Sequence, residues 1–145
     1  MTAGPIEIWD DGPAIRALVE LPGCPAARVL AAFTDPAVVA QWWGSGELTA
    51  DLVPGGRYRV YFAGPDATLL GQVVSYDPPG WLVFSWAWAH DADPPPCTVS
   101  IVADGQALRI EHGPHGDDEA GRTARSEHRA GWQYFLPKLA AALAG

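Results

Sequence analysis

Residues 120–144 read AGRTARSEHRAGWQYFLPKLAAALA, and this stretch decides the fold. Its large apolar side chains recur at the spacing of one helical face: Trp132, Phe135, Leu136, Leu139 and Leu143. The pattern predicts a long amphipathic helix that must lie against an apolar surface. Pro137 falls inside the pattern and is expected to kink the helix near Gln133, because proline cannot donate a backbone hydrogen bond.

The segment before this helix has a sequence period of two, which is typical of β-strands with one buried face. Strands are predicted at residues 15–21, 48–52, 57–62, 69–76, 82–88, 98–103 and 108–112, with a further short strand at 6–9. The links are short and rich in Gly, Pro and Asp, so they suit antiparallel pairs and cannot carry a parallel crossover. Two short helices are predicted after the first strand of this series, at 25–33 and from 36 to 42 or 43.

The alternation along these strands predicts that one face of the sheet is aromatic. Its inward side chains are Tyr58, Val60, Phe62, Leu82, Phe84, Trp86, Trp88, Leu108, Ile110 and His112. Their neighbours, such as Arg57, Arg59 and Glu111, are polar and are expected to face water. The C-terminal helix is the one predicted element that is long enough to cover the aromatic face.

The chain has 145 residues and is predicted to form a single domain, residues 1–145. Its formal net charge is -8, and Lys138 is its one lysine, which disfavours nucleic acid and anionic membranes as partners. No apolar run approaches the roughly 20 residues of a membrane span, and the N-terminus lacks the features of a signal peptide. We therefore expect a cytoplasmic protein, monomeric or homodimeric.

Cys24 and Cys97 stand far apart, without the CxxC or Cys/His spacing of a metal site. Two reduced, partly buried thiols are favoured over a disulfide, and no metal or other cofactor is predicted. The acidic run at 117–119 is interpreted as capping of the C-terminal helix. His115 lies in a glycine-containing loop and is interpreted as a solvated residue.

Four phrases of the chain carry a family resemblance: AAFTDPAVVAQWWG (31–44), PGGRYRV (54–60), GQVVSYDPPGWLVFSW (71–86) and GWQYFLPKL (131–139). In this order they resemble the START-like (SRPBCC, helix-grip) superfamily, and within it the bacterial branch named for similarity to the activator of the heat shock protein 90 ATPase. The resemblance implies an α+β fold. A curved antiparallel sheet of six or seven strands would wrap around a long C-terminal helix, leaving an apolar cavity between them.

Members of this superfamily bind lipids, sterols, polyketides or plant hormones, and some sequester toxic natural products. The resemblance thus implies binding of a small hydrophobic molecule, aromatic or polyketide-like, under the C-terminal helix, with self-resistance to a secondary metabolite as one variant. The predicted ligand-binding residues are Trp42, Trp43, Tyr58, Phe62, Phe84, Trp86, Trp88, His112, Arg125, His128 and Trp132. Any one of the aromatic residues could instead fill the core, where such side chains are common.

An enzyme is the alternative: some members are aromatase/cyclases, and here Tyr58, His112 and His128 would supply acid/base catalysis to a bound polyketide. The chain has no GxSxG, HExxH or glycine-rich phosphate motif that would indicate another chemistry. A third interpretation is a chaperone-interacting domain, as the name of the branch implies.

Overall fold

The computed structural model describes residues 4–144. Over this range nine strands form one antiparallel sheet in the order β1-β2-β9-β8-β6-β5-β4-β3, with β7 paired to β5. The strands are β1 (Ile6–Asp11), β2 (Ala14–Glu20), β3 (Glu47–Ala50), β4 (Arg57–Phe62), β5 (Ala67–Asp77), β6 (Trp81–Ser85), β7 (Ala87–Trp88), β8 (Thr98–Ala103) and β9 (Ala107–Gly113). The predicted α+β class with an antiparallel sheet is confirmed. The prediction of six or seven strands was too low, because β1 forms a full edge strand and the segment predicted at 82–88 divides into β6 and β7.

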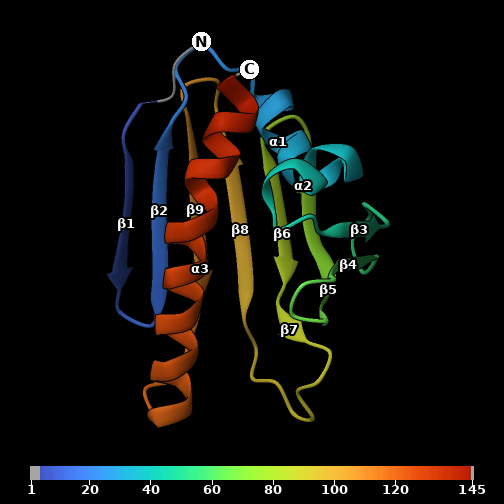
Figure 1. Cartoon of the computed structure of the whole chain (residues 1–145), viewed down its shortest axis with the longest axis vertical. Helices are drawn as coiled ribbons and strands as arrows, with labels where there is room; N and C mark the ends of the chain where they lie inside the picture. Colours follow the sequence, from blue (N-terminus) through green and yellow to red (C-terminus); the bar gives the residue numbers. More distant parts are fainter. Residues whose placement is uncertain (1–3, 145) are drawn as a thin grey trace.

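The helices cover one face of this sheet. In the described residues they are α1 (Ala26–Thr34) and α2 (Pro36–Trp42), which follow β2 as predicted, and α3 (Glu119–Ala144), which follows β9. Figure 1 shows α3 in front of β2, β9 and β8, with α1 and α2 beside its C-terminal half. None of the helices within residues 4–144 combines the length and apolar character that crossing a membrane requires.

Side-chain caps set where two of the helices begin. Asp35 Oδ1 accepts a hydrogen bond of 2.9 Å from the backbone N–H of Ala37, and a proline occupies the first position of α2. Asp118 Oδ1 accepts one of 2.8 Å from the N–H of Gly121 in the first turn of α3. The acidic run therefore caps α3, as the sequence predicted.

The concave shape of the sheet depends on β5. This strand pairs with β4 and β7 through its first half and with β6 through its second half. Its pairing with β6 shifts register between Val73 and Ser75, and a β-bulge of this kind bends a strand. At Gly71 a Cβ atom would lie 2.0 Å from the carbonyl oxygen of Ser85, so the close approach of β5 and β6 at this point requires glycine. One bent strand thus joins the two halves of the sheet.

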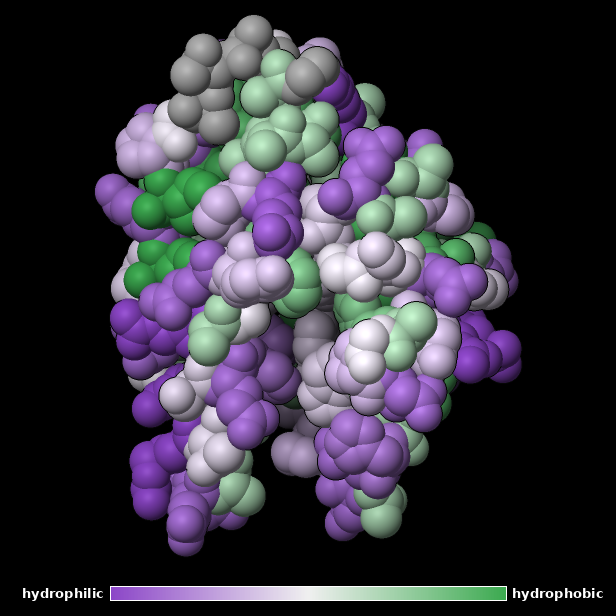
Figure 2. All heavy atoms as spheres, viewed as in Figure 1, coloured by the Kyte–Doolittle hydropathy of each residue, from purple (hydrophilic) through white to green (hydrophobic). Residues whose placement is uncertain are grey.

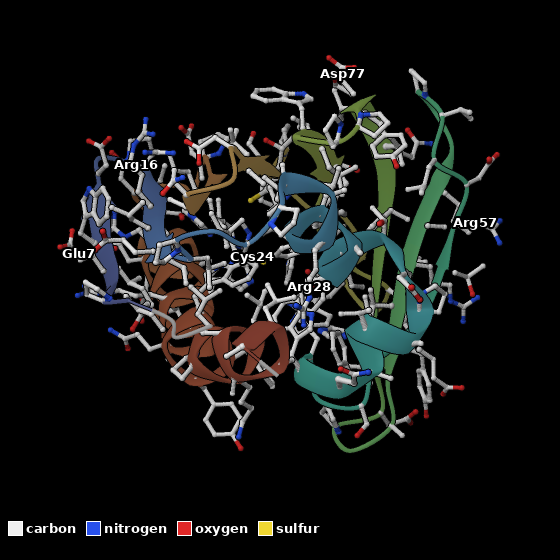
Figure 3. The ribbon with its side chains drawn as sticks, turned by 90° about the horizontal axis from the view of Figure 1, so that it is seen from above. Glu7, Arg16, Cys24, Arg28, Arg57 and Asp77 are labelled. Atoms are coloured by element: carbon white, nitrogen blue, oxygen red, sulfur yellow. The ribbon has the colours of Figure 1, made fainter. Side chains whose placement is uncertain are left out.

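The core lies between the concave face and the helices. The predicted inward side chains of β4, including Tyr58 and Val60, are buried, whereas Arg57 and Arg59 are exposed. On α3 the buried side chains are Trp132, Leu136, Leu139, Ala140 and Leu143, and the helix continues through the proline at 137. Figure 3 shows Cys24 among the interior side chains, while Arg57 points away from the sheet. The predicted division into an apolar and a polar face is confirmed.

Candidate functional site

A pocket of about 110 Å³ lies between α3 and the sheet. Its lining comes from the residue after α2, from the β6–β7 segment, from β9 and from α3: Trp43, Trp86, Trp88, His112, Glu127, His128, Gly131, Trp132 and Phe135. Figure 2 shows this face of the molecule hollowed beside the N-terminal half of α3. The pocket is open to solvent on one side and is walled mainly by aromatic rings.

The aromatic rings of the wall pack against one another. The ring centroid of Trp43 lies 6.0 Å from that of Trp132 and 6.1 Å from that of Trp86. Trp86 meets Trp88 edge to face at 5.5 Å. Such tilted and edge-to-face contacts are favourable for aromatic pairs and fix the rings in place. The rings of the wall are therefore held in place by contacts with one another.

Six of the eleven predicted ligand-binding residues line this pocket: Trp43, Trp86, Trp88, His112, His128 and Trp132. The other five do not. Two of these, Trp42 and Tyr58, instead satisfy the free carbonyl groups at the C-terminal end of α1. Trp42 Nε1 donates to the carbonyl of Ala32 at 2.7 Å, and the Tyr58 hydroxyl donates to that of Phe33 at 2.6 Å. Burial also raises the pKa of the Tyr58 hydroxyl far above its ordinary value, so the hydroxyl stays protonated at neutral pH.

The remaining three predicted residues have structural contacts elsewhere. Phe84 stacks on Tyr58 with a centroid distance of 4.0 Å, and Phe62 packs edge-on behind Trp43 at 5.8 Å. Arg125 donates from Nη1 to the carbonyl of Gly12 at 3.0 Å, which ties α3 to the turn between β1 and β2. The sheet alternation identified inward residues correctly, but it does not distinguish a pocket wall from the core behind it.

The interpretation of His115 as a solvated residue was wrong. Its side chain is buried, with Nδ1 3.1 Å from the carbonyl oxygen of Pro13 and Nε2 2.9 Å from Nδ1 of His128. A carbonyl only accepts, so Nδ1 of His115 carries the proton and Nε2 has the lone pair. His128 must then donate from Nδ1, and its Nε2 carries a free lone pair.

His112 adds a third imidazole to this cluster. Its ring stacks on that of His128 with a centroid distance of 4.5 Å and an interplanar angle of 16°. Trp132 Nε1 donates to His112 Nδ1 at 3.0 Å, so the remaining proton of the neutral ring sits on Nε2. The surrounding structure thus fixes the tautomers of all three histidines.

The histidines of the cluster are held in their neutral forms. Burial lowers the pKa of His112 well below its ordinary value, and the neighbouring His128 and His115 lower it further. Burial lowers the pKa of His128 to about 4, with a smaller contribution from His115. The pKa of His115 is lowered by burial as well, against a hydrogen bond to Pro13 that favours the charged form. At neutral pH the cluster therefore consists of neutral imidazoles that donate and accept hydrogen bonds.

Cys97 stands next to two of these histidines, and its sulfur and one nitrogen each of His112 and His115 lie within 4.8 Å of one another. The residue types would suit a transition metal. As arranged, however, the nitrogen lone pair of His112 accepts from Trp132, and that of His115 accepts from His128. Burial raises the pKa of the Cys97 thiol to about 11, so it stays protonated at neutral pH. In this arrangement the two imidazoles therefore use their lone pairs in hydrogen bonds within the protein.

Glu127, Gly131, Phe135 and His115 lay outside the predicted ligand-binding set; the first three carry a sequence signal and His115 carries none. Glu127, Gly131 and Phe135 follow one another at intervals of four on α3, so the helical period that identified Trp132 also places them on its pocket side. No local pattern marks His115, because its partners are Pro13 and His128, which only the fold brings to it.

A family model described as Activator of Hsp90 ATPase homolog 1-like protein matches residues 23–144. The chain belongs to this family. The match runs from α1 to the last turn of α3 and so includes every residue that lines the pocket. It confirms the resemblance that the four sequence phrases indicated.

Several solved structures share the fold. Protein MLL2253 from Mesorhizobium loti is 24% identical, with 89% of this chain and 96% of that chain covered and a TM-score of 0.73. CalU16 from Micromonospora echinospora is 22% identical, with coverage of 99% and 87% and a TM-score of 0.65. DynU16, described as a protein in the dynemicin biosynthetic locus, is 27% identical with a TM-score of 0.74; the match covers 92% of this chain and 48% of DynU16. This family member thus spans about half the length of DynU16. A search of curated proteins with this chain found no match.

Proposed function

We propose that this protein binds a small hydrophobic molecule, aromatic or polyketide-like, in the pocket between α3 and the sheet. The observation that carries the proposal is the composition of the pocket wall, in which four indole rings and one phenyl ring surround a space open to solvent. Ligand sites are typically concave and largely apolar, with a few polar groups that set orientation. The histidines on one side of this pocket supply such polar groups.

The size of the pocket limits what enters it. An engineered apolar cavity of about 150 Å³ is known to hold benzene, and this pocket measures about 110 Å³. A single aromatic ring is therefore the part of the ligand expected inside, with the rest of a larger molecule extending through the open side. Burial of apolar surface, at about 25 cal/mol per Å², supplies the affinity.

Sequestration for self-protection against a secondary metabolite is the form of this function that we favour. It is supported by the likeness to DynU16, a protein of a biosynthetic locus, at 27% identity. A cytoplasmic location is part of the proposal, because Cys24 and Cys97 are both free and buried, as suits a reducing compartment. Protection is tested by expressing the protein in a sensitive host and exposing that host to candidate metabolites.

Two measurements test binding. Native mass spectrometry of freshly purified protein should show a co-purifying small molecule, and titration with toluene should change the tryptophan fluorescence. Gly131 lies on the pocket wall, and a Cβ atom there meets nothing within 4 Å, so Gly131→Leu should block the pocket without disturbing the fold. Ala130→Leu, on the exposed side of the same turn, is the matched control. If the two variants bind toluene equally, or if no ring binds the unaltered protein, the proposal is wrong.

An acid/base enzyme is the second candidate, and the His115–His128 pair favours it. His128 presents a lone pair on a pocket-lining ring, and its orientation is fixed by His115 and, through it, by the Pro13 carbonyl. A base held by an orienting partner is the common arrangement in acid/base catalysis. This candidate predicts conversion of the co-purifying molecule by intact protein, reduced about 100-fold or more in His128→Phe. Binding without conversion would exclude it.

A further inference from the structure

Two unpaired donors stand on one wall of the pocket. Among residues 4–144, the buried side-chain atoms without a hydrogen-bond partner are Trp86 Nε1, His112 Nε2 and Arg129 Nε. Trp86 and His112 line the pocket and are 9% and 0% exposed, whereas the guanidinium of Arg129 contacts Asp10 on β1. Buried polar groups are nearly always paired. Two unpaired ones on the same wall indicate a partner that the chain itself does not supply.

Both unpaired groups are hydrogen-bond donors. An indole nitrogen can only donate, and the His112 ring must carry its proton on Nε2 because Nδ1 accepts from Trp132. The two rings lie side by side, with centroids 4.7 Å apart. A partner for either group is therefore an acceptor, and the neighbouring rings of Trp43, Trp88 and Phe135 have no lone pair to offer.

A free acceptor lies next to these donors. His128 donates from Nδ1 to His115, so its Nε2 carries a lone pair, and Nε2 has no hydrogen-bond partner among the described residues. The His128 ring is stacked on His112 at 4.5 Å and meets Trp86 edge to face at 5.2 Å. The three rings are in mutual contact and all line the pocket, and together they carry two N–H groups and one nitrogen lone pair that the described residues leave without a partner.

The geometry points to a phenolic hydroxyl as the ligand group recognised by Trp86, His112 and His128. A hydroxyl offers two lone pairs and one O–H, which matches two donors and one acceptor. Its aromatic ring would lie against the indoles of the wall. This inference rests on the proposed function and deepens it: the guest is a phenol rather than an aromatic hydrocarbon, an ether or a carboxylate, since a carboxylate would leave the His128 lone pair without a donor.

The test is a series of three probes of similar size: phenol, anisole and toluene. Phenol donates and accepts, anisole only accepts, and toluene does neither. Phenol should bind at least tenfold more tightly than toluene, although water solvates phenol better, and anisole should lie between them. In a ¹H–¹⁵N spectrum the indole N–H resonance of Trp86, assigned with Trp86→Phe, should move downfield with phenol and not with toluene.

The outcomes separate the two proposals. If toluene binds as tightly as phenol, or if anisole equals phenol, the pocket binds rings but this recognition is wrong. The recognition is also wrong if phenol binds without moving the Trp86 resonance, because water alone would then occupy the polar site. If none of the three probes binds, the proposed function fails with it.

A variant isolates the role of the lone pair. His128→Phe keeps an aromatic ring of similar size but removes the acceptor, so the preference for phenol over anisole should disappear. Toluene should still bind, which shows that the pocket of the variant is intact. His90→Phe, at a side chain that is 68% exposed, is the matched control and should keep the preference. An unchanged preference in His128→Phe would overturn the role of His128 as the acceptor. The roles of Trp86 and His112 as donors are tested by the probe series with the unaltered protein.

Discussion

The indole N–H of Trp132 donates a hydrogen bond of 3.0 Å to Nδ1 of His112, and this bond is buried where α3 crosses β9. It joins the covering helix to the sheet and at the same time fixes which nitrogen of His112 bears the proton. Structure and site chemistry thus depend on one contact. Its energetic contribution can be measured directly.

Trp132→Phe is expected to destabilise the fold beyond the loss of ring volume, because it leaves a buried nitrogen of His112 without a donor. The extra cost should be about 1–3 kcal/mol. Trp43→Phe makes the same change in ring size at a second buried residue of the pocket wall. Urea unfolding followed by circular dichroism compares the two variants. Equal losses of stability would show that the buried bond contributes little.

Stability should fall as the pH is lowered from about 6.5 to about 4. The neutral histidines have lowered pKa values in the folded protein, so the unfolded chain binds more protons in this interval and acid favours unfolding. For His128, a fall from 6.5 to about 4 corresponds to about 3 kcal/mol lost by pH 4. Urea titrations at several pH values measure the slope.

His128→Gln should flatten this pH dependence, because it removes a group whose pKa is lowered in the folded protein. Stability that is constant from pH 7 to pH 4 would contradict the burial of neutral imidazoles. The charged groups that act on His115 are Asp10 on β1, whose charge raises its pKa, and Arg125 on α3, whose charge lowers it. Their opposed effects leave burial as the dominant cause.

Tyr58→Phe should cost about 1–2 kcal/mol of stability and leave ligand affinity unchanged. The hydroxyl pairs with the buried carbonyl of Phe33 at the end of α1, and its removal leaves that carbonyl unpaired. Tyr61→Phe is the control, since the Tyr61 hydroxyl contacts Asp66 on the exposed surface and its loss should cost little. A large fall in affinity for toluene or phenol in Tyr58→Phe would show that Tyr58 takes part in ligand binding.

Two glycines should respond in opposite ways to alanine. Gly71→Ala places a Cβ atom 2.0 Å from the backbone oxygen of Ser85, where neither strand can yield without breaking the bend of β5, so a loss of more than about 3 kcal/mol or failure to fold is expected. Gly131→Ala meets nothing within 4 Å and should stabilise α3 by about 1 kcal/mol. Thermal unfolding of the two variants tests both signs.

Both cysteines should be unreactive in the native protein. Burial raises the pKa of the Cys97 thiol to about 11, and Cys24 is fully buried, so little accessible thiolate exists at pH 8. A disulfide reagent that reports free thiols should therefore react slowly with native protein and at once with both thiols in denaturant. Rapid reaction of one thiol under native conditions would instead indicate a Cys97 thiolate stabilised by a protonated His112.

The sequence by itself determined the elements and their faces. The helical stripe around Trp132 and Leu136 and the alternation along residues 57–62 are local periodicities, and each states which side of its own segment must leave water. The four sequence phrases added the order of the elements and the family. These features need no knowledge of the distances between segments, which is why they could be predicted.

Only the tertiary structure decided how the inward residues divide between core and pocket. Tyr58 and Trp86 are both inward residues of alternating strands. Tyr58 nevertheless bonds the end of α1, whereas Trp86 lines the pocket, because the position of a side chain in core or pocket depends on how closely α3 approaches the curved sheet. His115 pairs with His128, 13 residues later, and His112 pairs with Trp132, 20 residues later. In both pairs a residue of the C-terminal helix meets one that lies before the helix. Hydrogen-bond partners across such distances are set by packing geometry, and no local pattern encodes them.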